Sequence, residues 1–229
     1  MVWAAASRRQ PSGRRRRRWR WPQFRFDATK GYPGEGPTVT ATDPIFNMIS
    51  LNIGGASSTA TIHKYNRLQH YMRQHHIPIA FIQETKAPNQ AFVQSLMDPD
   101  FTAYECPNPV TSSHGGVAII VHTDISQHVH NLCTDHNLQW HSTLTDRQKD
   151  ALPHNQSAGR WMTIQIDLFN TTFTLVNHYA PSASPQARSV YYRSIATMWQ
   201  NTPNLIMAGD WNCVLDMYKD QITANNNPH

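Results

Sequence analysis

Short apolar runs of strand length alternate along this chain with two segments of helical periodicity, and this alternation restricts the fold to a few classes. The sequence predicts strands over residues 45–52, 79–84, 101–105, 116–122, 127–132, 160–168, 172–179 and 205–208. It predicts helices where apolar side chains recur three and four positions apart, over 62–76 and 186–200, and a shorter helix over 89–98. We therefore expect an α/β class fold: a four-layer sandwich of two packed sheets flanked by helices. Residues 133–158 are polar without a clear period and are interpreted as a long surface excursion.

The first 44 residues differ in composition from the rest. Residues 1–30 carry ten of the 20 Lys and Arg residues and one acid, so the net charge of +5 comes from this segment and the remainder is acidic. We expect residues 1–44 to be a disordered extension and residues 45–229 to form the domain. Its densest basic stretch comprises Arg14, Arg15, Arg16, Arg17, Arg18, Trp19 and Arg20.

This stretch leaves several interpretations open. Arginines attract phosphates and tryptophan stacks on bases, so weak nucleic-acid binding is one. A nuclear-import signal, a transit peptide and a misassigned start are the others. No apolar stretch follows the basic run, so we expect a nuclear rather than a secreted protein.

Two further classes of protein are excluded. No apolar run approaches the roughly 18 residues that a membrane span needs, so no membrane partner is expected. There are 3 cysteines and no Cys-x-x-Cys pair, which predicts neither a disulfide partner nor a zinc site.

Polar residues close several of the predicted strands, and strand ends bring distant residues to one rim of a sheet. Taken singly, a Glu at a strand end is usually a solvated cap, and Asp-x-Asn is usually a turn. Taken together, two carboxylates, amides and a phenol fit a hard cation with oxygen ligands that leaves room for water and a substrate phosphate. The strand-closing residues are Asn52, Glu84, Asn177, Tyr179, Asp210 and Asn212.

The order of five segments adds to this pattern. They are Ser50-Leu51-Asn52-Ile53-Gly54-Gly55, Ile82-Gln83-Glu84-Thr85, Gly115-Gly116-Val117-Ala118-Ile119, Asn177-His178-Tyr179-Ala180-Pro181-Ser182 and Gly209-Asp210-Trp211-Asn212. In this order they resemble the endonuclease/exonuclease/phosphatase superfamily over about residues 46–220. Within this superfamily, two segments look most like the apurinic-type endonuclease domain of non-long-terminal-repeat retrotransposons: Gly159-Arg160-Trp161 and the segment from Gly209 to Asp216.

The resemblance implies a metal-dependent phosphodiesterase that nicks DNA with Mg²⁺ or Mn²⁺. By similarity, Glu84 would bind the metal and Asn52 would help to place it. Tyr179 would contact the scissile phosphate, Asp210 would orient or deprotonate the attacking water, and Asn212 would hold a phosphate oxygen. Asn177, in the same motif as Tyr179, joins this catalytic group. Its neighbour His178 is expected to face outward.

The sequence also departs from the family pattern. Gly54 stands where an acidic or amide residue usually follows the first Asn by two positions. After Asn212 there is no Ser-Asp-His, whose His is central to catalysis in the family; Thr134-Asp135-His136 has similar letters but precedes the 160–168 strand, so we interpret it as a coincidence. We therefore expect a domain that is incomplete at its C-terminus. Two alternatives follow: an inactive fragment whose basic tail binds nucleic acid or import factors, and a phosphatase or phosphodiesterase of the same superfamily.

Overall fold

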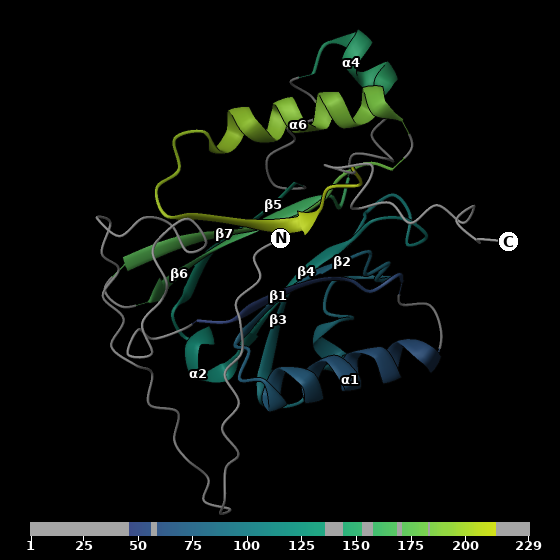
Figure 1. Cartoon of the computed structure of the whole chain (residues 1–229). Coiled ribbons are helices and arrows are strands. Elements are labelled where there is room, and N and C mark those ends of the chain that lie inside the picture. Colours follow the sequence, from purple (N-terminus) through teal and green to yellow (C-terminus); the bar gives the residue numbers. More distant parts are fainter. Residues whose placement is uncertain are drawn as a thin grey trace, which may run out of the picture.

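Two four-stranded sheets face each other in the computed structural model, with helices on their outer sides (Figure 1). The structure describes residues 46–55, 59–135, 144–152, 158–168, 171–182 and 184–213. The predicted sandwich is confirmed. The expected disorder of residues 1–44, with its arginine run, lies outside the described residues, and the domain boundary at residue 45 stays a prediction.

The first sheet has the order β1-β2-β4-β3 and the second the order β5-β6-β7-β8. The strands of the first sheet are β1 (Met48–Asn52), β2 (Ile79–Gln83), β3 (Phe101–Cys106) and β4 (Val117–His122). Those of the second are β5 (Val129–Thr134), β6 (Trp161–Leu168), β7 (Thr171–Tyr179) and β8 (Leu205–Asp210). The predicted hairpin of residues 160–168 and 172–179 is the antiparallel pair β6 and β7.

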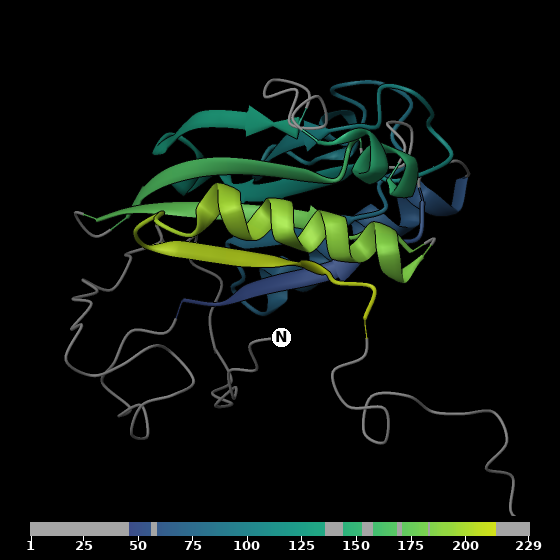
Figure 2. The same ribbon diagram turned by 90° about the horizontal axis from the view of Figure 1, so that it is seen from above.

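One parallel pair in each sheet positions the polar rim. Helix α1 (Thr59–Gln74) crosses between β1 and β2, and α6 (Pro185–Trp199) crosses between β7 and β8. Parallel strands end at the same edge of a sheet. The register accordingly sets Asn52 beside Gln83 and Tyr179 beside Asp210. Strands β1 and β8 also lie close to each other, at the same margin of the sandwich (Figure 2).

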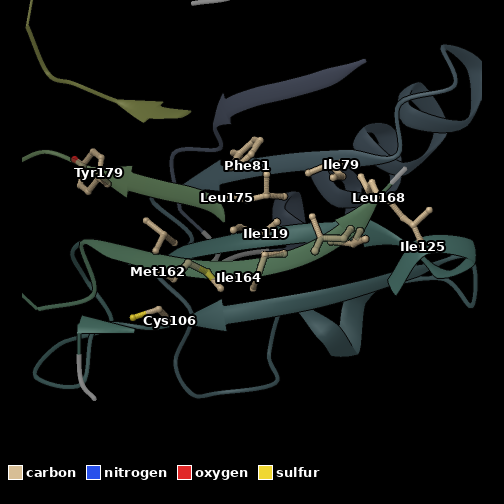
Figure 3. Close-up of a cluster of buried hydrophobic side chains, with 13 residues drawn as sticks. Ile79, Phe81, Cys106, Ile119, Ile125, Met162, Ile164, Leu168, Leu175 and Tyr179 are labelled. Atoms are coloured by element: carbon tan, nitrogen blue, oxygen red, sulfur yellow. The ribbon is translucent and has the colours of Figure 1, made fainter. Parts of the chain in front are cut away.

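The core fills the space between the sheets. Ile79, Phe81 and Ile119 of the first sheet pack with Met162, Ile164 and Leu175 of the second, and all six are buried (Figure 3). The removal of these apolar side chains from water is the main force holding the sheets together.

Each long helix buries one apolar stripe on the outer face of its sheet. Helix α1 buries Tyr65, Leu68 and Met72 against the first sheet. Helix α6 buries Tyr191 and Ile195 in a cluster that includes Trp161 of the second sheet. Figure 1 shows α1 and α6 on opposite sides of the sandwich, which completes the four layers.

The predicted helix over 89–98 is largely wrong. Only Gln94–Leu96 is helical, as a single 3₁₀ turn. Ala91 has a positive φ of 74°, which interrupts a helix. The buried carboxylate of Glu105 accepts hydrogen bonds from the backbone N–H groups of Val93 (2.9 Å) and Gln94 (2.7 Å) and fixes the turn.

The interpretation of residues 133–158 as a surface excursion is also wrong in part. Strand β5 continues to Thr134, and helix α4 (Asp146–Ala151) follows later. Thr145 and Gln148 form a capping box at its start, and the flanking Leu144 and Leu152 are buried. Residues 136–143 and 153–157 lie outside the described residues.

Two further observations concern the described residues only. None of the helices among them has the length and apolar composition to cross a membrane. Cys106, Cys133 and Cys213 are free thiols.

Candidate active site

Asn52 and Asp210 meet at the rim where β1 and β8 end. The Asn52 amide (Nδ2) donates a 2.8 Å hydrogen bond to Oδ2 of Asp210, across 158 residues of sequence. The side-chain oxygen of Asn52 in turn accepts a hydrogen bond from Gly54 N (2.9 Å). The first and last strands of the described fold therefore share one polar contact at this rim.

Glu84 follows β2 directly and stands between two partners. Its Oε1 accepts a hydrogen bond from the Tyr179 hydroxyl, and its Oε2 lies 3.3 Å from Lys86 Nζ. Burial acts to raise the pKa of Glu84, but the hydrogen bonds from Tyr179 and Lys86 and the Lys86 charge outweigh burial, so the pKa lies below its usual value. Glu84 is therefore held as a carboxylate.

Backbone contacts between loops fix the segment that carries Glu84. Thr85 N donates a hydrogen bond to Gly116 O, and Lys86 N donates one to Gly115 O; each distance is 3.0 Å. Gly116 has a positive φ of 81°, and a Cβ there would collide with the Thr85 side chain. A glycine is required where the two loops meet.

Asp210 and Asn212 form a tight turn after β8. Asn212 N donates to Asp210 Oδ1 (2.8 Å), and Asn212 Nδ2 donates to Ala180 O (2.6 Å). Asn212 has a positive φ of 47°, a conformation that Asn tolerates well. With Asn52 on Oδ2, both carboxylate oxygens of Asp210 are held by donors, which fixes their direction.

Tyr179 lies at the end of β7, and Figure 3 shows it at one end of the central apolar cluster. Burial raises the pKa of its hydroxyl, and the neighbouring Glu84 carboxylate raises it further. The guanidinium carbon of Arg160 sits 4.6 Å from the ring centroid, a cation–π contact. Arg160 is buried, and its packing against Tyr179 gives it a place at the site that its sequence context alone does not indicate.

Asn177 does not join the rim. It is fully buried, and its Nδ2 donates to the backbone oxygens of Ile82 (2.9 Å) and Ala118 (2.7 Å). Its Oδ1 accepts a hydrogen bond from Gln83 Nε2 (2.8 Å). Its amide is used inside the core, so Asn177 holds the two sheets together and does not face the rim with Tyr179, contrary to its expected place in the catalytic group.

His178 is buried rather than outward-facing, contrary to the expectation from sequence. Its ring packs 4.0 Å from the Trp211 ring, and neither ring nitrogen has a hydrogen-bond partner among the described residues. Burial lowers the pKa of His178 to about 4, so this ring is neutral at pH 7.

Asp135, of the Thr134-Asp135-His136 sequence, has contacts that support the fold. Its Oδ2 accepts a hydrogen bond from Arg160 N (2.7 Å), and its Oδ1 accepts one from Cys106 Sγ (3.1 Å). His136 lies outside the described residues. The carboxylate therefore anchors the start of β6.

The described rim residues fit a magnesium-type ion better than a softer metal. Among the described residues there is no group of three or more His, Cys, Asp and Glu side chains suited to a metal. The rim instead offers the Glu84 and Asp210 carboxylates and the Asn52 amide. Mg²⁺ is commonly bound through one or two carboxylates and retains several waters, so this donor set is adequate for it.

Comparison with known proteins places these residues in a family context. The model of the endonuclease/exonuclease/phosphatase family matches residues 49–227. A comparison with curated proteins gave no match.

Several solved structures resemble the chain. They include the endonuclease domain of TRAS1, a telomere-specific non-LTR retrotransposon (14% identity, TM-score 0.47, 74% of this chain and 60% of that one). The AP endonuclease LMAP from Leishmania major has 17% identity and a TM-score of 0.47, with 72% and 54% of the two chains covered. The mannosyl-6-phosphatase Bt3783 of Bacteroides thetaiotaomicron has 12% identity and a TM-score of 0.48, with 73% and 66% covered. The chain thus spans between 54% and 66% of the length of these proteins.

Proposed function

This chain belongs to the endonuclease/exonuclease/phosphatase family, and we propose that it hydrolyses phosphodiester bonds with a divalent metal ion, nicking one strand of DNA. The observation that carries this proposal is the convergence at one rim of Asn52, Glu84, Tyr179, Asp210 and Asn212, which come from four separate strands and loops.

The contacts at the rim suggest a division of roles. Glu84 and Asn52 would hold Mg²⁺ or Mn²⁺, which when bound offsets the negative charge that develops on the phosphoryl oxygens. Asp210, fixed by Asn52 and by Asn212 N, would orient a water and accept its proton. The Asn212 amide would donate a hydrogen bond to the phosphate. Tyr179, whose hydroxyl donates its one hydrogen to Glu84, would contact the phosphate and hold the Glu84 carboxylate in place.

We propose DNA, and not a sugar phosphate, as the substrate because of the sequence around two strands. The segment Gly159-Arg160-Trp161 leads into the first residue of β6, and the segment from Gly209 to Asp216 includes the end of β8. The sequences of both segments resemble those of the retrotransposon endonucleases. The phosphatase or small-molecule phosphodiesterase of the same superfamily is the alternative. A panel of supercoiled plasmid, abasic duplex and sugar phosphates separates the two.

The decisive experiment is plasmid nicking by the full chain with Mg²⁺ and with EDTA. We expect Glu84→Gln and Asp210→Asn to reduce Mg²⁺-dependent nicking by at least about a hundredfold. Asp167→Asn, which removes an exposed carboxylate elsewhere on β6, is the matched control and should nick like the wild type. Wild-type nicking rates in either rim variant, or nicking that survives EDTA, would reject the proposed site.

The basic extension supports a second candidate function, nucleic-acid binding by an inactive chain. Half of all Lys and Arg residues lie in residues 1–30. The test compares DNA affinity before and after deletion of residues 1–30, over a range of salt concentrations. Affinity that vanishes with the deletion and falls steeply with salt assigns binding to the extension. Affinity that persists and depends on Glu84 and metal assigns it to the rim.

A further inference from the structure

Both oxygens of the Glu84 carboxylate are already engaged by the chain itself. The Tyr179 hydroxyl donates to Oε1, and the Lys86 ammonium lies 3.3 Å from Oε2. Glu84 is also the residue to which the proposed function assigns the metal. A divalent ion arriving at this carboxylate therefore meets a cation that is already paired with it.

The backbone and the neighbouring loop place Lys86 at this position. Glu84 and Lys86 both have positive φ values, 54° and 47°. Lys86 N also donates a 3.0 Å hydrogen bond to Gly115 O. The aliphatic part of Lys86 passes over Gly55, where an added Cβ would lie 2.7 Å from Lys86 Cδ. The missing side chain at Gly55 thus makes the space in which Lys86 reaches Glu84.

From this geometry we propose that Lys86 is a resident counter-cation of Glu84, which a divalent metal displaces and which sets the metal affinity of the site. The inference rests on the proposed function, since it takes Glu84 as the metal ligand. In the metal-free protein the ammonium offsets the carboxylate charge. When a metal binds, the lysine side chain turns away from Glu84. Breaking the Lys86–Glu84 ion pair costs free energy, so the metal binds more weakly than it would without Lys86.

Lys86 is the partner that yields, for reasons visible in its contacts. Its side chain is 30% exposed, so the ammonium regains water when it leaves Glu84. A partly exposed ion pair of this kind is weak. Tyr179 is held by a buried ring beneath Arg160 and cannot turn away as readily.

The test is a Mn²⁺ titration of the full chain by calorimetry, without DNA and without any measurement of activity. We expect Lys86→Met to tighten Mn²⁺ binding about twofold to fivefold, the effect of removing a weak competing ion pair. Lys86→Arg, which keeps the charge, should bind like the wild type. Lys64→Met is the matched control: Lys64 Nζ donates to Ile53 O (2.7 Å) near the same rim, and its loss should change affinity less than about twofold.

The outcomes separate this inference from the proposed function. If Lys86→Met binds Mn²⁺ no more tightly than Lys64→Met, the inference is wrong. If Glu84→Gln leaves Mn²⁺ binding unchanged, or the wild type and Lys86→Met both fail to bind, the proposed metal site is wrong as well. Thermal unfolding of each metal-free variant verifies folding, and Lys86→Gln replaces Lys86→Met if the latter is unfolded.

Discussion

Gln83 and Asn177 join the two sheets in the interior of the sandwich, where Gln83 Nε2 donates a 2.8 Å hydrogen bond to Asn177 Oδ1. Asn177 in turn donates to the backbone oxygens of Ile82 and Ala118 in the first sheet. One side chain of β7 therefore makes three hydrogen bonds to β2 and β4. Its position fixes how the second sheet is placed on the first, and hence how the halves of the rim meet.

Asn177→Ala should destabilise the fold by about 2–4 kcal/mol, because buried polar groups lose their partners. Urea unfolding at pH 7 measures this change. Gln127→Ala is the matched control, since Gln127 Nε2 donates one exposed hydrogen bond to Asp124 O (3.3 Å) and its loss should cost less than about 1 kcal/mol. Equal losses in the two variants would contradict the structural assignment of Asn177.

Tyr179→Phe should slow nicking by about tenfold to a hundredfold, because the hydroxyl that contacts Glu84 is lost while the ring remains packed. The melting temperature should change little. Tyr104→Phe removes a hydroxyl that donates to Ser126 O (3.3 Å), away from the rim, and should nick at the wild-type rate. A Tyr179→Phe rate equal to that of Tyr104→Phe would remove Tyr179 from the site.

His178 should make the fold less stable in mild acid. Well above pH 6.5 its ring is neutral in both the folded and the unfolded chain, so it has no effect on the pH dependence of stability there. As the pH falls from about 6.5 to about 4, the unfolded chain binds a proton that the buried ring does not, and stability is lost progressively. The loss at pH 4 amounts to about 3 kcal/mol for this group.

The measurement for His178 is urea unfolding at pH 7 and at pH 4.5, in the wild type and in His178→Phe. The substitution keeps an aromatic ring against Trp211 but removes the titrating group. The wild type should lose more stability than the variant between the two pH values. Identical losses would show that His178 is protonated as easily in the folded chain as in the unfolded one.

Gly209→Ala should destabilise the fold by about 1–3 kcal/mol, because a Cβ there would collide with the backbone oxygen of His178 in the adjacent strand, which cannot move aside easily. Gly54→Ala provides the comparison. Gly54 has a positive φ of 65°, but a Cβ there would meet only Lys64 Nζ, at 3.9 Å, so only the backbone strain of about 1 kcal/mol applies. Denaturant unfolding of both variants should rank Gly209→Ala as the less stable.

The strands and the rim residues were predictable because their signals are local. Apolar runs such as 79–82 and 205–208 are too short for helices and are followed by polar residues, so both the strand and its polar end can be predicted from the sequence. The start of α4 also has a local signal, because Thr145 precedes Gln148 by three positions, the spacing of a capping box. This helix was not predicted because the surrounding residues are polar and show no helical period.

The sequence does not indicate which positions of a strand are buried between the sheets and which lie at the rim. Asn177 and Tyr179 are two positions apart and share a face of β7, yet one lies inside the sandwich and the other at its rim. That difference depends on where β2 and β4 cross β7, which is a property of the packed sheets. The contact of Lys86 with Glu84 depends likewise on two positive φ values that residue type does not encode.

The order of strands in each sheet has a consequence for the geometry of the rim. β1 and β8 each pair with one neighbour among the described strands and stand at the end of their sheet, and each carries a rim residue at its carboxyl end. The hydrogen bond between Asn52 and Asp210 therefore joins one sheet to the other and lies within neither. A small sliding of one sheet over the other would change the spacing of these two residues directly, so the rim is as rigid as the packing between the sheets.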